Sequence, residues 1–104
     1  MPDDTPVLDT IADMTAASIA RCGLDADELI LVRLAALAAV DARPVSYLAH
    51  IGASIDAGVT LEQVQDVLVA VAPIIGSARV MAAAEHITEA LGIAIAIVEA
   101  EADA

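Results

Sequence analysis

The sequence predicts an all-α protein, a single domain of about five to six helices spanning residues 1–104. Hydrophobic residues make up 60% of the 104 residues, yet only one residue is aromatic. Apolar residues recur at helical spacing, and proline and capping signals divide the chain into segments of helix length. A chain of this length can enclose one hydrophobic core but not two. Because alanine, valine, isoleucine and leucine supply most of the bulk, we expect the helices to pack closely against one another.

Charge and hydropathy exclude several classes of protein. The formal charge is −12, with four arginines and no lysine, so nucleic acid is not an expected partner. The longest charge-free stretches, residues 44–55 and 67–78, have 12 residues each. A membrane-spanning helix needs about 20, so no membrane association is expected. The N-terminus lacks the basic and apolar segments of a signal peptide, and we therefore expect a cytoplasmic protein.

Capping signals mark the first two helices. Thr5 precedes Pro6 in the pattern of an N-cap followed by proline in the first turn, and Gly23 is expected to end this helix. Asp25, with Glu28 three residues later, forms the capping-box pattern that starts the second helix.

The second helix is expected to run to about Ala42. Between residues 29 and 40 its only polar residue is Arg33, so this helix should lie at the centre of the fold. Pro44 is expected to open a third helix in its first turn, and Gly58 to close it.

A second capping box starts the fourth helix. Thr60 and Gln63 have the required spacing, and the helix is expected to continue through Val71. Pro73 and Gly76 are expected to interrupt it.

Ser77 is the expected cap of a fifth helix that ends near Gly92. Residues 93–98 alternate as a strand would, but no other segment offers a strand partner, so a short helix is favoured. The tail, residues 93–104, suits an arm that packs on a neighbouring subunit. Oligomerisation is expected because so small a chain would struggle to hide this much apolar surface.

Three sequence segments and a glycine resemble the carboxymuconolactone decarboxylase family, which shares its fold with the alkylhydroperoxidase D-like proteins. The segments are LILVRLAALAA at residues 29–39, SYLAH at 46–50 and AGVTLEQV at 57–64, followed by Gly76. The resemblance covers residues 25–92. It implies an all-helical domain that assembles into trimers or hexamers. It also implies one of two activities, decarboxylation of a muconolactone or thiol peroxidase and disulfide reductase chemistry.

The thiol chemistry associated with the family requires Cys-x-x-Cys followed, after three residues, by histidine. Counting back from His50, the two cysteines would fall at Arg43 and Ser46. The chain contains a single cysteine, Cys22, which has no resolving partner. We therefore expect no peroxidase activity and no cofactor.

His50 is the candidate catalytic residue, because imidazole can exchange a proton near neutral pH. Ser46 and Tyr47 lie one helical turn earlier and are candidate substrate-binding residues. The alternative is that His50 bridges backbone groups at a subunit contact. Tyr47, likewise, could simply pack at an interface with its hydroxyl hydrogen-bonded.

Arg33 and Arg79 are candidate ligands for a substrate carboxylate. A lone cation in an apolar helix needs an anionic partner, and a carboxylate substrate would provide one. The alternative for Arg33 is a structural ion pair with an acid of a partner chain or of this chain, for example Glu28, Glu62 or Glu85. For Arg79 the alternative is a paired surface arginine.

The remaining titratable residues suggest no metal site. His86 with Glu85 and Glu89 has ligand-like spacing, but one histidine and two carboxylates on a solvated helix face arise often by chance. Cys22 is expected to be a small filler beside a helix end.

Two hypotheses for the function follow. In the first, the chain is a lyase of the decarboxylase type that acts by acid/base catalysis on a small anionic carboxylate or lactone. The net charge of −12 opposes the approach of such a substrate, so local arginines would have to overcome it. In the second, it is a non-catalytic oligomeric helical module that kept the fold.

Overall fold

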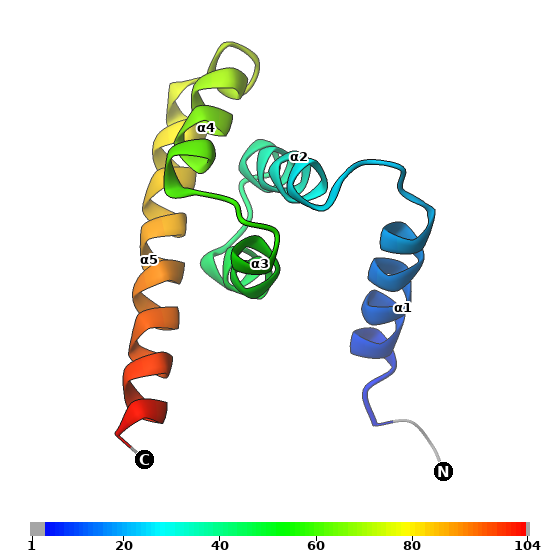
Figure 1. The fold of residues 1–104 in the computed structure, drawn as a ribbon. Coiled ribbons are helices and arrows are strands. Elements are labelled where there is room, and N and C mark those ends of the chain that lie inside the picture. Colours follow the sequence, from blue (N-terminus) through cyan, green and yellow to red (C-terminus); the bar gives the residue numbers. More distant parts are fainter. Residues whose placement is uncertain (1–3, 104) are drawn as a thin grey trace.

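The computed structural model describes residues 4–103, and within them the chain forms five α-helices and no strand. The predicted all-α class is confirmed. The helices are α1 (Pro6–Arg21), α2 (Ala26–Ala39), α3 (Pro44–Asp56), α4 (Leu61–Ile75) and α5 (Ser77–Ala102), shown in Figure 1.

The first four helices start where the capping signals predicted them. At α4, the Gln63 N–H donates to Thr60 Oγ1 (3.1 Å) and the Thr60 N–H donates to Gln63 Oε1 (2.9 Å). At α2, the Asp25 N–H donates to Glu28 Oε1 (3.2 Å). These bonds satisfy N–H groups at the helix start that have no partner within the helix.

The end of α2 was predicted three residues too late. The helix ends at Ala39 instead of continuing to Ala42, because Asp41 adopts a left-handed conformation with φ +54°. The Ala42 N–H donates to the Leu37 carbonyl (2.9 Å) and the Asp41 N–H to the Ala38 carbonyl (3.2 Å). This is a Schellman ending, in which aspartate takes the place more often held by glycine.

Pro73 does not interrupt α4, so the predicted end at Val71 was also wrong. The helix passes through Pro73 and ends at Ile75, where Gly76 follows with φ +87°. Pro73 removes one N–H donor, the one that would bond the Val69 carbonyl, and the remaining hydrogen bonds of the 15-residue helix hold it to Ile75.

Helix α5 is continuous over 26 residues, which corrects two further expectations. Gly76, not Ser77, occupies the N-cap, and Gly92 lies inside the helix instead of ending it. A glycine inside a helix costs about 1 kcal/mol relative to alanine, and the alanine and leucine residues around Gly92 favour continuation. The helical conformation expected for residues 93–98 is confirmed, but as part of α5 instead of a separate element.

By length and composition alone, α5 qualifies as a helix that could cross a membrane. Because this criterion tolerates two charged residues, the lack of a charge-free stretch longer than 12 residues does not exclude α5. One such helix is weak evidence for a span, and 11% of its apolar window is buried within the fold. Ala83 and Ala90 of α5 are packed in the protein core.

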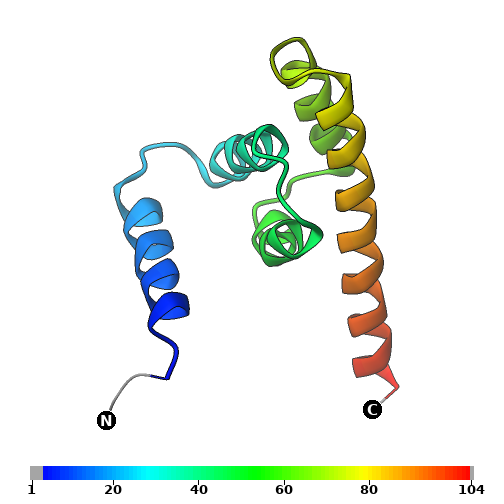
Figure 2. The same ribbon diagram turned by 180° about the vertical axis from the view of Figure 1, so that it is seen from behind.

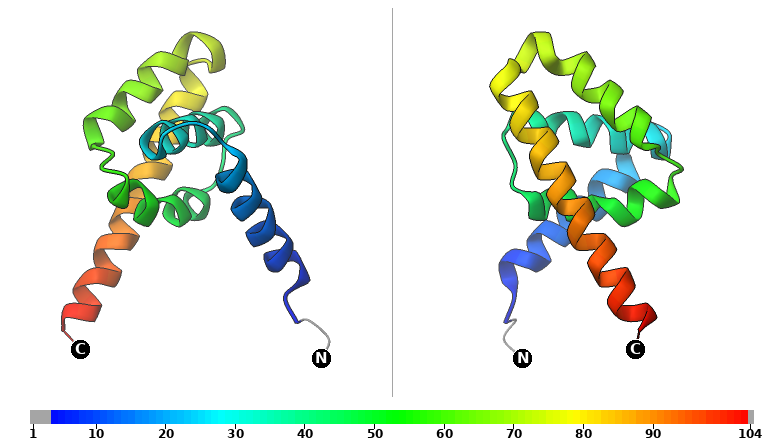
Figure 3. Two further views of the ribbon diagram at one scale, coloured as in Figure 1. Left: turned by 45° about the vertical axis from the view of Figure 1, so that its right-hand side comes forward. Right: turned by 90° about the vertical axis from the view of Figure 1, so that its left-hand side faces the viewer.

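The hydrophobic core is small and centred on α2, as predicted. Ile30, Leu34 and Ala38 of α2 are at most 6% exposed, and α2 packs against α3, α4 and α5. Helix α3 runs antiparallel to α2 and packs on α5 (Figure 3). The other buried residues are Tyr47, Ala83 and Ala90.

Two helical arms extend from this core. Helix α1 stands apart from the other four helices, and the C-terminal half of α5 projects beyond them (Figures 1 and 2). The radius of gyration is 15.1 Å, against about 13 Å for a compact chain of this length. Large apolar side chains on both arms are exposed, among them Val7 and Met14 on α1 and Ile95 and Val98 on α5.

The contrasting conformations of Gly76 and Gly92 give a stability test. Gly76→Ala is expected to destabilise the protein by about 1 to 3 kcal/mol, because its positive φ is unfavourable for a residue with a Cβ. Gly92→Ala is expected to stabilise it by about 1 kcal/mol, because Gly92 is helical and has no atom within 4 Å of an added Cβ. Urea unfolding followed by circular dichroism measures both. Destabilisation by Gly92→Ala would contradict a continuous α5.

Candidate functional site

A groove with a volume of about 620 Å³ lies between α1, α2 and α3. It brings together three of the predicted site residues, Arg33 from α2 and Ser46 and His50 from α3. The rest of its lining is mostly apolar and comprises Ile11, Thr15, Ile19, Ala26, Leu29, Ile30, Leu37, Ala49, Ala53, Asp56 and Ala57.

The His50 ring is oriented by the preceding turn of its own helix. Its Nδ1 lies 2.7 Å from the Ser46 carbonyl oxygen. Because a carbonyl can only accept a hydrogen bond, Nδ1 carries the hydrogen in the neutral ring, and the lone pair is on Nε2. Ser54 Oγ donates to the His50 carbonyl (2.7 Å), the next link along the same helix. The half-buried imidazole thus has one nitrogen engaged and one available.

Arg33 is half-buried and connects α2 to the arm formed by α1. Its Nη2 donates to Ser18 Oγ (2.9 Å). Within residues 4–103 it forms no ion pair, so the suggested partners in this chain do not neutralise it. An acid of a partner chain stays open as an alternative. A hydroxyl is a neutral acceptor, so the guanidinium keeps its full charge and its other donors can bind an anion.

Asp56 also lines the groove and was missed by the sequence analysis. It is the last residue of α3 and is exposed. The helical spacing of the sequence could have indicated it. Residues 46, 50, 53 and 57 share one face of the helix, and Asp56 lies beside that face.

Tyr47 lies away from the groove. It is 2% exposed and lines a second, smaller cavity of about 140 Å³ among α2, α3, α4 and α5. Its hydroxyl is buried and has no hydrogen-bond partner among the described residues. Burial raises the pKa of this hydroxyl above its ordinary value of 10.0, and the negative charge of Asp41 raises it further.

Arg79 is likewise separate from His50 and Arg33. Its Nη1 donates to the carbonyl oxygen of Ala39, the last residue of α2. A cation there satisfies a carbonyl that has no partner within the helix and complements the negative end of the helix dipole. The geometry therefore gives Arg79 a structural contact, and its role toward a substrate stays a prediction.

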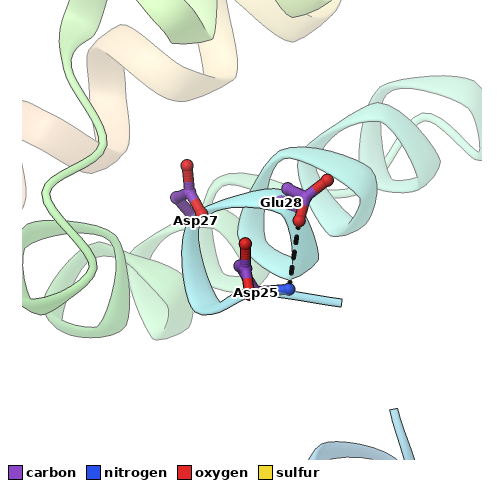
Figure 4. Close-up of side chains that lie close together, drawn as sticks. All are labelled: Asp25, Asp27 and Glu28. Carbon is purple, nitrogen blue, oxygen red and sulfur yellow. Dashed lines mark hydrogen bonds between the residues drawn. The ribbon is translucent and has the colours of Figure 1, made fainter. Parts of the chain in front are cut away.

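Three acidic side chains cluster at the start of α2 (Figure 4). Ligand atoms of Asp25, Asp27 and Glu28 lie within 4.8 Å of one another. Glu28 already serves as a cap, accepting from the Asp25 N–H. The cluster places negative charge at this end of α2, where the helix dipole favours it.

His86 differs from the expectation of a solvated helix face. Glu85 and Glu89 are exposed, but His86 is half-buried, and its Nδ1 is buried without a hydrogen-bond partner among the described residues. Cys22, a free thiol, is half-buried directly after α1, which is near the position expected for it.

Residues 5–98 match the carboxymuconolactone decarboxylase family. The chain belongs to this family, and the match extends beyond the resemblance noted for residues 25–92 to include α1 and more of α5. Comparisons with curated proteins and with solved structures gave no significant match.

Tyr47 offers a test of core packing at alkaline pH. Its folded pKa is above its unfolded value, so the folded state holds the proton more tightly, and stability is lost as the pH rises through 10. The chain has no lysine and no second tyrosine, so no other side chain has an ordinary pKa near 10.

We expect the free energy of unfolding to fall as the pH rises above about 10 in the natural protein and to stay nearly level in Tyr47→Phe. Urea unfolding over this range measures the difference, and tyrosinate absorbance reports the titration itself. An equally steep loss in Tyr47→Phe would show that another group is responsible.

Proposed function

We propose that this member of the carboxymuconolactone decarboxylase family is an acid/base catalyst that moves a proton on a small carboxylate or lactone without redox cysteines. The observation that carries this proposal is that Arg33 and His50 line the same groove. Among residues 4–103, Arg33 has no anionic partner and Nε2 of His50 has no hydrogen-bond partner.

The first step is capture of the substrate carboxylate. The guanidinium of Arg33 presents donors in a planar fork that matches the two carboxylate oxygens. The apolar lining of the groove, including Leu29 and Leu37, accommodates the body of the substrate. Removal of water around the ion pair strengthens it and holds the substrate beside His50.

The second step is proton transfer at His50. The Nε2 lone pair accepts a proton from a carbon next to the lactone carbonyl, and the electron pair left on the substrate is delocalised onto the carbonyl oxygen. The imidazolium keeps its Nδ1–H bond to the Ser46 carbonyl, which holds the ring in place. Nε2 then returns the proton to the substrate, so the histidine ends in its initial state.

Two alternatives have less support. A non-catalytic module would be favoured by a groove without convergent polar groups, whereas this groove contains an arginine, a serine and a histidine. A thiol peroxidase needs a resolving thiol, and the chain contains only Cys22.

The proposal is tested by hydrogen–deuterium exchange at carbon. The purified protein is incubated in D₂O with a γ-butyrolactone that carries one carboxylate, and proton NMR follows the C–H next to the lactone carbonyl. His50→Gln is expected to slow catalysed exchange by about 10² to 10⁴-fold, the usual contribution of a general base. Arg33→Met is expected to weaken binding by about 10 to 100-fold.

Arg43→Met is the matched control, because it removes an exposed arginine that does not line the groove. It should leave exchange within about twofold of the natural protein. Exchange that persists in His50→Gln would overturn the assignment of His50 as the base.

We further propose that the protein is a cytoplasmic homo-oligomer, a trimer or hexamer. The support is the exposed apolar surface on α1 and on the end of α5, which a neighbouring subunit would cover. The acidic surface would keep such an assembly soluble.

Light scattering at micromolar concentration tests the assembly. The natural protein should have the mass of a trimer or hexamer, and Met14→Asp should shift it toward smaller species, because Met14 is 66% exposed on α1. Gln65→Glu, which adds one negative charge on the exposed side of α4, is the control and should leave the mass unchanged. A natural protein that is monomeric would contradict the proposal.

A further inference from the structure

The charges around the groove indicate which substrates it can hold. Among residues 4–103 its lining contains one permanent cation, Arg33, and one carboxylate, Asp56. Binding a single substrate carboxylate to Arg33 therefore uses the only permanent positive charge that the groove offers. A second substrate carboxylate would have to lie near one of the two ends of the groove.

The end of the groove near Asp56 is anionic. Helices α2 and α3 run antiparallel, so the last turn of α3 lies beside the first turn of α2 (Figure 3), and Ala26 and Ala57 both line the groove there. Asp56 stands six residues after His50, about 9 Å further along the helix axis. The carboxylates of Asp25, Asp27 and Glu28 belong to the same end of α2 (Figure 4).

The lining of the opposite end of the groove supplies no compensating charge. Leu37 and Ser46 line this end, and neither is a cation. Arg43, the N-cap of α3, and Arg79 are near this end but outside the lining, and Arg79 is engaged with the Ala39 carbonyl. An uncompensated carboxylate would lose hydration without gaining a partner. The net charge of −12 adds to this cost for any dianion that approaches.

The stability of helix α3 does not explain why an aspartate occupies its last position, residue 56. A carboxylate at the last position of a helix faces the negative end of the helix dipole, which is unfavourable. Within the described residues its side chain forms no ion pair and no hydrogen bond that would offset this. Its effect on the charge of the groove is therefore the main physical consequence of its position.

We infer that the groove selects substrates with a single carboxylate on a neutral or apolar body and discriminates against dicarboxylates, with Asp56 as a specificity-determining residue. This inference rests on the proposed function, in which Arg33 anchors the substrate carboxylate. A neutral lactone ring, or another neutral body with its polar group toward His50, fits both the charge and the apolar lining.

Calorimetric titration of the full-length protein with two matched probes tests the inference. One probe is the γ-butyrolactone with one carboxylate, and the other is the same lactone with a second carboxylate on the neighbouring ring carbon. At low ionic strength, where screening is weak, the monocarboxylate should bind about tenfold more tightly.

Asp56→Asn should improve binding of the dicarboxylate more than that of the monocarboxylate and reduce their ratio by about threefold to tenfold. This variant is expected to fold, because removing the charge relieves its unfavourable interaction with the helix dipole. Asp66→Asn is the matched control. It changes the net charge equally at an exposed position of α4 outside the groove, and it should leave the ratio unchanged.

Equal or tighter binding of the dicarboxylate to the natural protein would overturn the inference, as would a ratio that Asp56→Asn does not change. An equal effect of Asp66→Asn would assign the selectivity to net charge instead of to Asp56. Failure of the proposed function would give a different result from failure of the selectivity inference. In that case neither probe would bind, or Arg33→Met would leave the binding of both probes unchanged.

Discussion

Close packing of α2 against α3, α4 and α5 through small side chains is the contact on which the rest of the structure depends. Ala38, Ala83 and Ala90 are among the least exposed residues, at 2% or less. Without phenylalanine or tryptophan to fill wide gaps, the helices bury apolar surface only by close approach. The side of α2 that carries Arg33 flanks this contact, since Ile30 and Leu37 border both the core and the groove, and it forms one wall of the groove.

The small size of the core also explains why the two helical arms are exposed. Only six side chains among the described residues are buried and hydrophobic, so α1 and the end of α5 keep most of their apolar surface in solvent. One wall of the groove is the arm α1, held to α2 by the hydrogen bond from Arg33 to Ser18. The shape of the candidate site and the proposed assembly of subunits therefore depend on the same helix.

In a chain with so few cations, the position of each arginine largely determines what it can do. Arg79 is directed to a carbonyl at the end of α2 and stabilises the fold there. Arg33 has a neutral partner and retains its charge for an anion. Asp56, at the same groove, adds a negative charge to its lining. The anion binding that we propose for this acidic protein would thus depend on one local charge that the net charge does not reveal.

The sequence by itself determined the all-α class, the family and the starts of the first four helices, because capping boxes and first-turn prolines act within a few residues. It was less reliable for helix ends, where Asp41, Pro73 and Gly92 have conformations that depend on hydrogen bonding and packing around them. Residue chemistry alone was sufficient to select His50 and Arg33 as candidates. Only the tertiary structure showed that Tyr47 and Arg79 lie apart from His50 and Arg33, and that Asp56 lines their groove. The physical reason is that the helices packed against a helix decide which of its faces borders a groove.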